Sequence, residues 1–157
     1  MESRSKRRVV FTLELEHNLF TKMQHYRTLV VDDVEDFRRF LRSTLEQRTE
    51  CQVVGEASDG WQAVQQAKEL QPDLILLDLG LPTLNGIQAA RRIRLLSPNS
   101  KILFFTQNCS PEIAQGALRT GANGYLLKSD ADDLPNAVET VLRGEQFVSS
   151  RVSGLLS

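Results

Sequence analysis

The sequence predicts an α/β fold in which one doubly wound parallel sheet of five strands carries helices on both faces. Three observations support this class. From residue 27 onward, short apolar runs alternate with amphipathic stretches. The run DLILLD, residues 73–78, is almost continuously apolar, as expected for a strand that is covered on both faces. The 157 residues, of which 41% are hydrophobic, suit a single domain with one core and short extensions.

The strands are expected where short apolar runs are bounded by polar residues or glycine. They are residues 28–31, 51–57, 73–78, 101–105 and 123–128. If they pair in the order 2-1-3-4-5, the connections between them are right-handed crossovers through the intervening helices.

The helices are expected over residues 34–47, 60–70, 86–96, 110–121 and a last stretch that ends near Gly144. Their inward-facing residues recur at helical spacing. These residues are Val34, Phe37, Leu41 and Leu45, then Val64 and Ala67, then Ile87, Ala90 and Ile93, and finally Leu134, Ala137, Val138, Val141 and Leu142. The fourth helix starts with the N-cap Ser110 and Pro111 and stops at Gly121. Pro135 is tolerated only in the first turn of the last helix.

Composition excludes several functional classes. A net charge of -1 gives no overall field that would favour nucleic acid or a membrane surface. Cys51 and Cys109 show neither close pairing nor metal-type spacing, which favours a reducing, cytoplasmic setting. No apolar run approaches the ~18 residues of a membrane span. Glu14 and Glu16 break the apolar start, so we do not interpret it as a signal peptide.

The pattern divides the chain into an extension (1–25), the α/β domain (26–148) and a linker stub or C-terminal tail (149–157). The basic run 4–8 is expected to be a solvated tail. Residues 9–16 alternate apolar and polar side chains, which favours a strand added to the edge of a sheet in this chain or a partner. A loose helix, or a start site chosen upstream of Met23, would explain this stretch equally well.

Polar, reactive residues stand at four of the five strand ends. Asp32 and Asp33 follow the first strand, Asp78 ends the third, Thr106 the fourth and Lys128 the fifth. Ligands of open α/β sheets bind at the carboxyl ends of the strands, near the point where strand order reverses. In the order 2-1-3-4-5, Asp78 lies one strand, ~4.8 Å, from the acid pair. We therefore expect these five side chains to share one crevice.

Three carboxylates in one crevice need a counter-charge to remain ionised. Mg²⁺ would supply it, because this ion prefers hard oxygen ligands and accepts phosphate oxygens readily. Asp78 would then be a plausible nucleophile toward a phosphoryl group, since aspartate forms acyl phosphates. Lys128 and the Thr106 hydroxyl would hold the remaining phosphoryl oxygens.

The motifs VVDD, LLDLGLPTLNG, FFT and GANGYLLK, in this order, resemble the receiver domain of bacterial two-component response regulators, whose fold is flavodoxin-like. The resemblance spans about residues 26–148. It implies that Asp78 is the phosphoacceptor. It also implies that Asp33 binds Mg²⁺ directly, Asp32 partly through water and Gly80 through its backbone carbonyl.

The same resemblance implies that Thr106 and Lys128 are the switch residues and that Tyr125 is the aromatic side chain that rotates inward on activation. Gly80 and Asn108 match positions that tune dephosphorylation, and Gln107 stands where the family usually has a small residue. The resemblance is strongest to receivers that precede a helix-turn-helix DNA-binding domain, because residues 144–150 read GEQFVSS.

The function implied is a phosphorylation-dependent switch that accepts its phosphoryl group from a histidine kinase and regulates an output, with transcription the expected one. It would assist its own phosphorylation and dephosphorylation without being an enzyme with a separate substrate. A homodimer through the fourth helix, fifth strand and fifth helix is possible, whereas direct nucleic-acid binding by this chain and membrane insertion are not expected.

Three alternatives remain. A degenerate receiver would work without phosphate as a protein-interaction module, and Gln107 keeps that alternative open. An aspartyl-phosphate phosphatase would need a second acid where Gly80 stands. A dinucleotide-binding module would need a glycine-rich turn in place of the acidic stretch that follows the first strand, and a cobalamin-type binder would need a histidine near Asp78.

Overall fold

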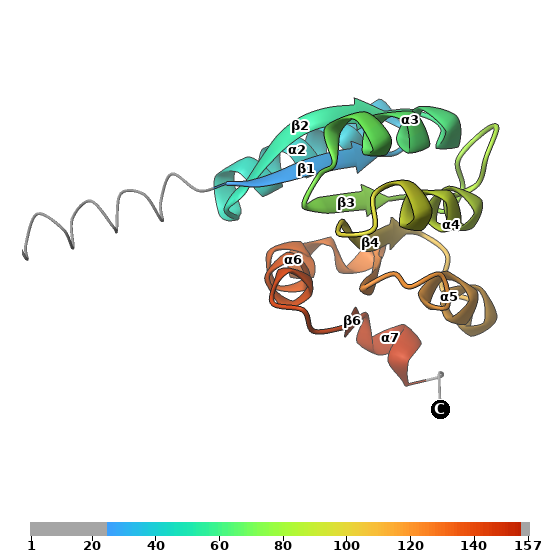
Figure 1. Cartoon of the computed structure of the whole chain (residues 1–157). Coiled ribbons are helices and arrows are strands. Elements are labelled where there is room, and N and C mark those ends of the chain that lie inside the picture. The colour runs from blue at the N-terminus through green and yellow to red at the C-terminus, as the bar shows by residue number, and fades with distance from the viewer. Residues whose placement is uncertain (1–24, 155–157) are drawn as a thin grey trace, which may run out of the picture.

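A computed structural model describes residues 25–154 of the chain. Its centre is a parallel sheet with the strand order β2-β1-β3-β4-β5-β6 (Figure 1). The strands are β1 (Tyr26–Val31), β2 (Cys51–Ala57), β3 (Leu74–Leu77), β4 (Lys101–Thr106), β5 (Gly124–Leu127) and β6 (Phe147–Val148). The predicted fold class and the order 2-1-3-4-5 are confirmed. The short β6 was not predicted, and the expectations for residues 1–24 lie outside the described residues.

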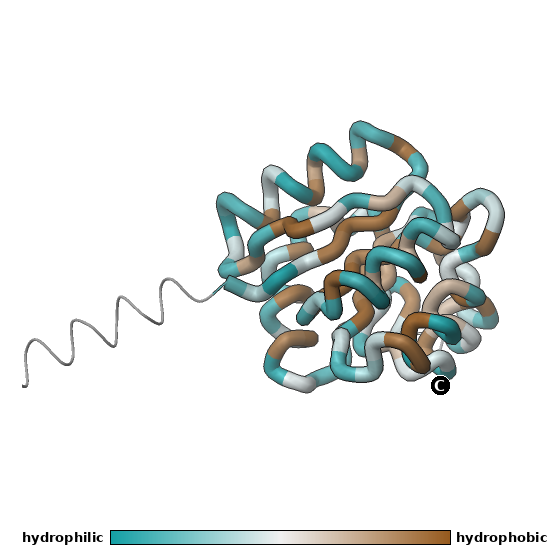
Figure 2. The backbone as a smooth tube through the Cα atoms, turned by 45° about the horizontal axis from the view of Figure 1, so that its top comes forward, coloured by the Kyte–Doolittle hydropathy of each residue, from teal (hydrophilic) through white to brown (hydrophobic). Residues whose placement is uncertain are grey.

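Helices cover both faces of the sheet. They are α2 (Glu35–Arg48), α3 (Gly60–Leu70), α4 (Gly86–Leu96), α5 (Pro111–Leu118), the 3-10 helix η1 (Lys128–Asp133), α6 (Leu134–Leu142) and the short α7 (Ser150–Ser153). Buried side chains of α3, α4 and α5 form one hydrophobic core, and those of α2 and α6 form the other. The tube in Figure 2 shows hydrophobic residues gathered along the central strands and hydrophilic residues on the outer turns of the helices.

The two cores follow from the two-residue period of the strands. Val31 of β1 faces the core beneath α3 and α4, whereas its neighbour Val30 faces the core beneath α2 and α6. Leu77 and Leu76 of β3 divide in the same way. Because both faces are covered, each strand needs apolar residues at successive positions, which explains the continuous apolar runs of the sequence.

Polar caps fix where three of the helices begin. The Asp59 carboxylate accepts the Gln62 amide proton at the start of α3. Asn85 and Gln88 form a reciprocal capping box at the start of α4. Ser110 caps α5 ahead of a proline in its first turn. The caps of α3, α4 and α5 end the loops that follow β2, β3 and β4, at the edge of the sheet where these strands end.

The segment after α6 returns to the sheet. Phe147 pairs with Gly124 in the β5–β6 ladder. Ser149, which is buried, donates its amide proton to the Tyr125 carbonyl (2.9 Å). Its hydroxyl oxygen accepts the amide proton of Leu127 (2.9 Å). Ser149 therefore ties the segment after α6 to β5 through one hydrogen bond that it donates and one that it accepts.

Among residues 25–154, the longest helices fall short of the length and apolar character that crossing a membrane requires.

Candidate metal and phosphoryl site

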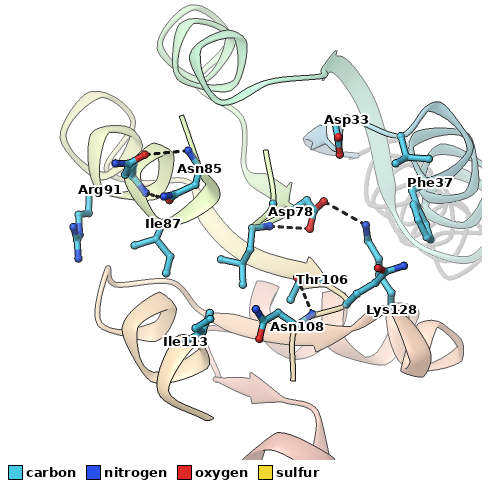
Figure 3. A pocket seen from close by; sticks show the side chains of 15 residues that line it. Asp33, Phe37, Asp78, Asn85, Ile87, Arg91, Thr106, Asn108, Ile113 and Lys128 are labelled. Atoms are coloured by element: carbon cyan, nitrogen blue, oxygen red, sulfur yellow. Dashed lines mark hydrogen bonds and ion pairs between the residues drawn. The ribbon is translucent and has the colours of Figure 1, made fainter. Parts of the chain in front are cut away.

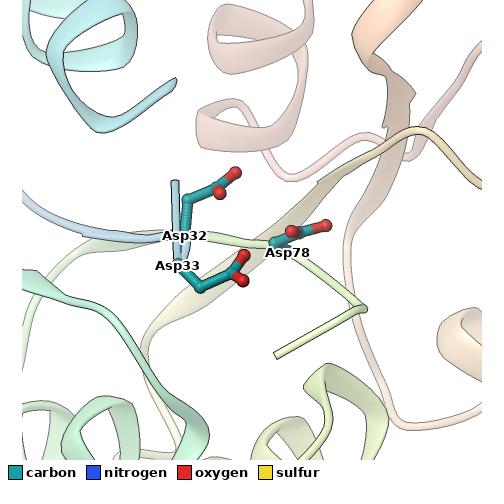
Figure 4. A group of neighbouring side chains, drawn as sticks. All are labelled: Asp32, Asp33 and Asp78. Atoms are coloured by element: carbon teal, nitrogen blue, oxygen red, sulfur yellow. The ribbon is translucent and has the colours of Figure 1, made fainter. Parts of the chain in front are cut away.

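Three aspartates meet at the carboxyl edge of the sheet (Figure 4). Val31 pairs with Leu77 in neighbouring parallel strands, so the residues that follow each strand leave the sheet side by side. Asp32, Asp33 and Asp78 each place one carboxylate oxygen within 4.8 Å of the others. Asp32 is fully buried and Asp33 is exposed, while Asp78 is 8% exposed. The convergence that the sequence predicted for these three residues is thus present in the structure.

Lys128 provides the counter-charge for the buried acids. Its Nζ lies 2.7 Å from Asp32 Oδ2 and 3.4 Å from Asp78 Oδ2, and its side chain is only 7% exposed. The ammonium group also lies 3.8 Å from the centroid of the Phe37 ring, a cation–π contact. Lys128, the residue that directly follows β5, therefore reaches back to the ends of β1 and β3, as its position after a strand predicted.

The electrostatics of Asp78 favour a further cation. Burial raises the pKa of its carboxyl, the nearby Asp32 charge raises this pKa further, and Lys128 lowers it. Asp78 Oδ1 accepts the Leu79 amide proton (2.8 Å), and Asp32 Oδ1 accepts that of Val34 (2.9 Å). Asp32 Oδ2 is buried and, despite its ion pair, lacks a hydrogen bond of good geometry. Clustered carboxylate oxygens, one of them buried without a hydrogen bond, are hard ligands that suit a divalent cation such as Mg²⁺.

The switch residues predicted from the sequence lie on the next two strands. Thr106 is buried at the end of β4, and its hydroxyl oxygen accepts the Asn108 amide proton (3.2 Å). Tyr125 is fully buried, and its hydroxyl donates to the Asn108 carbonyl (2.6 Å). Burial raises the pKa of the Tyr125 hydroxyl further above neutrality, which is consistent with a protonated hydroxyl that donates this hydrogen bond. The Asn108 backbone thus links Thr106 to Tyr125.

The acids open into a cleft of about 800 Å³ (Figure 3). Asp33, Asp78, Thr106 and Lys128 line one part of it. The three tuning positions line it as well, namely Gly80, Gln107 and Asn108. Asn85, Ile87 and Arg91 of the α4 region and Ile113 of α5 extend the cleft away from the acids. The Asp78 side chain is therefore reachable from solvent through this cleft.

Two contributors were missed by sequence reasoning. Phe37 was assigned only to a helix face, yet it lies beneath the Lys128 ammonium. Arg38 donates from Nη1 to the Asp32 backbone carbonyl (2.8 Å), and its Nε lies 3.5 Å from Glu56. Neither role has a signal in the local sequence, because both depend on which helical residues face the loop after β1.

A glycine allows the loop after β3 to fold back under the site. At Gly86, the first residue of α4, a Cβ atom would collide with the Asp78 carbonyl oxygen. The Gly86 amide instead donates to the Leu79 carbonyl (2.8 Å). The backbone of Asp78 is therefore fixed by direct contact with the start of the next helix.

Comparison with known proteins identifies relatives of this arrangement. The family model of the response regulator receiver domain matches residues 28–139. The nitrate/nitrite response regulator protein NarL of Escherichia coli is 35% identical over 130 residues, which are 82% of this chain and 60% of NarL. The transcriptional regulatory protein LiaR of Bacillus subtilis is 36% identical over 129 residues, 82% of this chain and 61% of LiaR. The chain therefore spans about three fifths of the length of these curated relatives.

Solved structures agree with the sequence matches. A LuxR-family two-component response regulator from Aurantimonas superposes with a TM-score of 0.80 at 34% identity, covering 85% of this chain and 96% of the other. The isolated receiver domain of RcsB from Salmonella enterica, solved with the phosphomimetic BeF3-, gives a TM-score of 0.79 at 28% identity and covers 85% and 100%. The chain therefore belongs to the response regulator receiver domain family.

Proposed function

We propose that this receiver is a signalling switch that takes up a phosphoryl group on Asp78 from a histidine kinase. The observation that carries the proposal is the convergence of Asp32, Asp33, Asp78, Thr106 and Lys128 at one rim that opens into a cleft. The use of a phosphoryl mimic with the RcsB receiver domain supports it by analogy.

Uptake would form one bond and break one. A carboxylate oxygen of Asp78 attacks the phosphorus of a phosphohistidine, an O–P bond forms, and the P–N bond breaks with its electrons passing to the imidazole nitrogen. Lys128, already 3.4 Å from Asp78, would hold a phosphoryl oxygen, and the Thr106 hydroxyl would donate to another.

Mg²⁺ would be held by Asp32, Asp33, Asp78 and the Gly80 carbonyl, and it would neutralise charge on the phosphoryl group. Asp33 is the exposed member of the set, which suits direct contact with an ion that keeps several waters. Buried Asp32 is already paired with Lys128, which suits a role that is shared with water.

The response would be a shift between two conformations. A phosphoryl group adds about -1.5 to -2 charges. Thr106 and Lys128 would move toward it and alter the contacts of Asn108 and Tyr125. A nearly complete switch, from 1:99 to 99:1, requires about 5.5 kcal/mol of differential stabilisation.

The output would pass through α5, β5 and α6, the surface at which a homodimer is proposed. Because β6 already pairs with the outer edge of β5, such a contact would use the helices and not the strand edge. Regulation of transcription would follow through another part of the protein or a partner, since we assign no nucleic-acid contact to this chain. We also propose that residues 26–148 form the receiver domain and that the protein acts in the cytoplasm.

The test is Mg²⁺-dependent labelling with radioactive acetyl phosphate. The wild-type chain should acquire label that hydroxylamine removes, as expected of an acyl phosphate, and chelation of Mg²⁺ should abolish uptake. Asp78→Asn should take up none, whereas the matched control Asp36→Asn, an exposed acid outside the cluster, should label normally. Label persisting in Asp78→Asn at the wild-type level would refute the assignment.

A phosphate-independent receiver is the second candidate. It is favoured by the ion pairs through which Lys128 already neutralises the buried acids, and by Gln107 in the cleft. Absence of label in a folded wild-type chain, with acetyl phosphate and with a kinase, would select this candidate.

A further inference from the structure

An apolar groove lies between α3 and α4, away from the aspartates. We define the α3–α4 groove by its lining residues, Trp61, Val64, Gln65, Lys68, Arg92, Leu95 and Leu96, and its volume is about 350 Å³. Leu95 is 84% exposed, Trp61 46% and Leu96 40%. Single exposed apolar residues are common, but three that are large and gathered in one groove indicate a contact surface.

The charge of the groove is one-sided. Both of its charged residues, Lys68 and Arg92, are basic. The Arg92 guanidinium lies 4.5 Å from the centroid of the Trp61 ring, a cation–π contact that places a positive charge next to the apolar side chains of the groove. An occupant that combines alternating apolar side chains with carboxylates would match this surface.

We propose that the occupant is the chain's own segment 9–16, VVFTLELE. In an extended conformation, Phe11, Leu13 and Leu15 would share one face and enter the groove. The charged residues of the segment, Glu14 and Glu16, would lie on its other face, so the segment as a whole carries the charge opposite to that of the groove without burying its carboxylates. The basic run 4–8 precedes the segment and would remain outside.

The described fold places the start of β1 near one end of the groove. Arg27 Nη1 donates to the carbonyl of Leu70, at the end of α3 (2.6 Å). Gln71 Nε2 donates to the carbonyl of Leu96, at the end of α4 (3.0 Å). The stretch between Glu16 and Arg27 can extend over ~30 Å, whereas Trp61 and Lys68 are separated by only ~10 Å along α3.

The tether also makes docking possible without strong affinity. A short covalent tether gives an effective concentration of about 1 mM, so a segment with a dissociation constant in that range would occupy the groove about half of the time. A second copy of the chain at micromolar concentration would compete poorly with such an intramolecular contact.

Trp61 is the only tryptophan of the chain, so its fluorescence reports directly on the groove. The experiment measures acrylamide quenching of the full-length chain and of Leu13→Asp. The matched control is Thr12→Asp, which adds the same charge to the opposite face of the segment. A further full-length variant, Leu95→Asp, changes the groove at a side chain so exposed that the fold tolerates the change.

Docking predicts that the quenching constant of Trp61 rises by about twofold in Leu13→Asp, because the indole loses its cover. Leu95→Asp should raise the quenching constant similarly, and Thr12→Asp should not raise it, because it adds an acid on the face that stays outside the groove. The values should not depend on protein concentration. Equal quenching in all four proteins would overturn the proposal, as would protection that appears only when the chain dimerises on size exclusion.

Discussion

Replacing Lys128 by methionine tests the electrostatics of the site. The variant keeps a long apolar stem near Phe37 but removes the charge that lies 2.7 Å from Asp32 and 3.4 Å from Asp78. Removing one partner of a buried ion pair costs about 3–5 kcal/mol in the free energy of unfolding. Protonating one aspartate limits the loss, since this costs about 4 kcal/mol at pH 7 for a carboxyl of ordinary pKa near 3.9.

We therefore expect Lys128→Met to lower the free energy of unfolding by about 2–4 kcal/mol at pH 7 without Mg²⁺. The loss should shrink to about 1.5 kcal/mol at pH 5, where protonation is easier. The direction of this pH dependence follows from Asp78. Its pKa is raised in the folded state by burial and by Asp32. A group of this kind binds protons more readily when folded, so stability falls as the pH rises.

Urea denaturation at pH 5 and pH 7, with and without Mg²⁺, measures these free energies. Mg²⁺ should restore part of the loss, because it supplies the missing positive charge. Lys101→Met, at a lysine outside the acid cluster, is the matched control and should change little. A loss below about 1 kcal/mol that is the same at both pH values would show that the buried charges are not balanced as argued.

Two further predictions concern packing and thiol access. Gly86→Ala should lower the free energy of unfolding by about 3 kcal/mol, because its methyl group meets the Asp78 carbonyl oxygen. A Cβ atom added at Gly80 would meet no atom within 4 Å, so Gly80→Ala should change the free energy of unfolding by less than about 0.5 kcal/mol. Equal effects of the two substitutions in urea denaturation would contradict this contrast. Exposed Cys109 should react quickly with a thiol reagent in the native protein, whereas burial raises the pKa of Cys51 and should protect it until the chain unfolds. Fast reaction of both thiols would disprove the burial of Cys51.

Much of the fold was predictable because the buried parallel strands and the helix caps leave clear local signals. The expected helices 60–70 and 86–96 have the bounds that the structure gives to α3 and α4. The strand β6 was missed because two half-buried residues produce no periodicity. The helix η1 was missed because its sequence KSDADD is polar and contains no buried residue.

Some features of the site were likewise predictable from the sequence, and others were not. That the acids, Thr106 and Lys128 would converge followed from strand ends and strand order. That the ammonium group of Lys128 would already lie between Asp32 and Asp78 did not, because it depends on the path of a long side chain. The burial of Asp32 beside an exposed Asp33 is also a property of the loop that the sequence does not display. The assignment of roles to these residues stays a prediction until phosphoryl uptake is measured.

The two hydrogen bonds between Ser149 and β5 have a mechanical consequence. Its amide holds the Tyr125 carbonyl and its hydroxyl holds the Leu127 amide, so the chain after α6 is coupled to the strand that leads into Lys128. Val152 is buried in the core and seats α7, so this stretch cannot swing independently. Any displacement of the end of β5 would therefore also displace Ser149 and, with it, the start of α7.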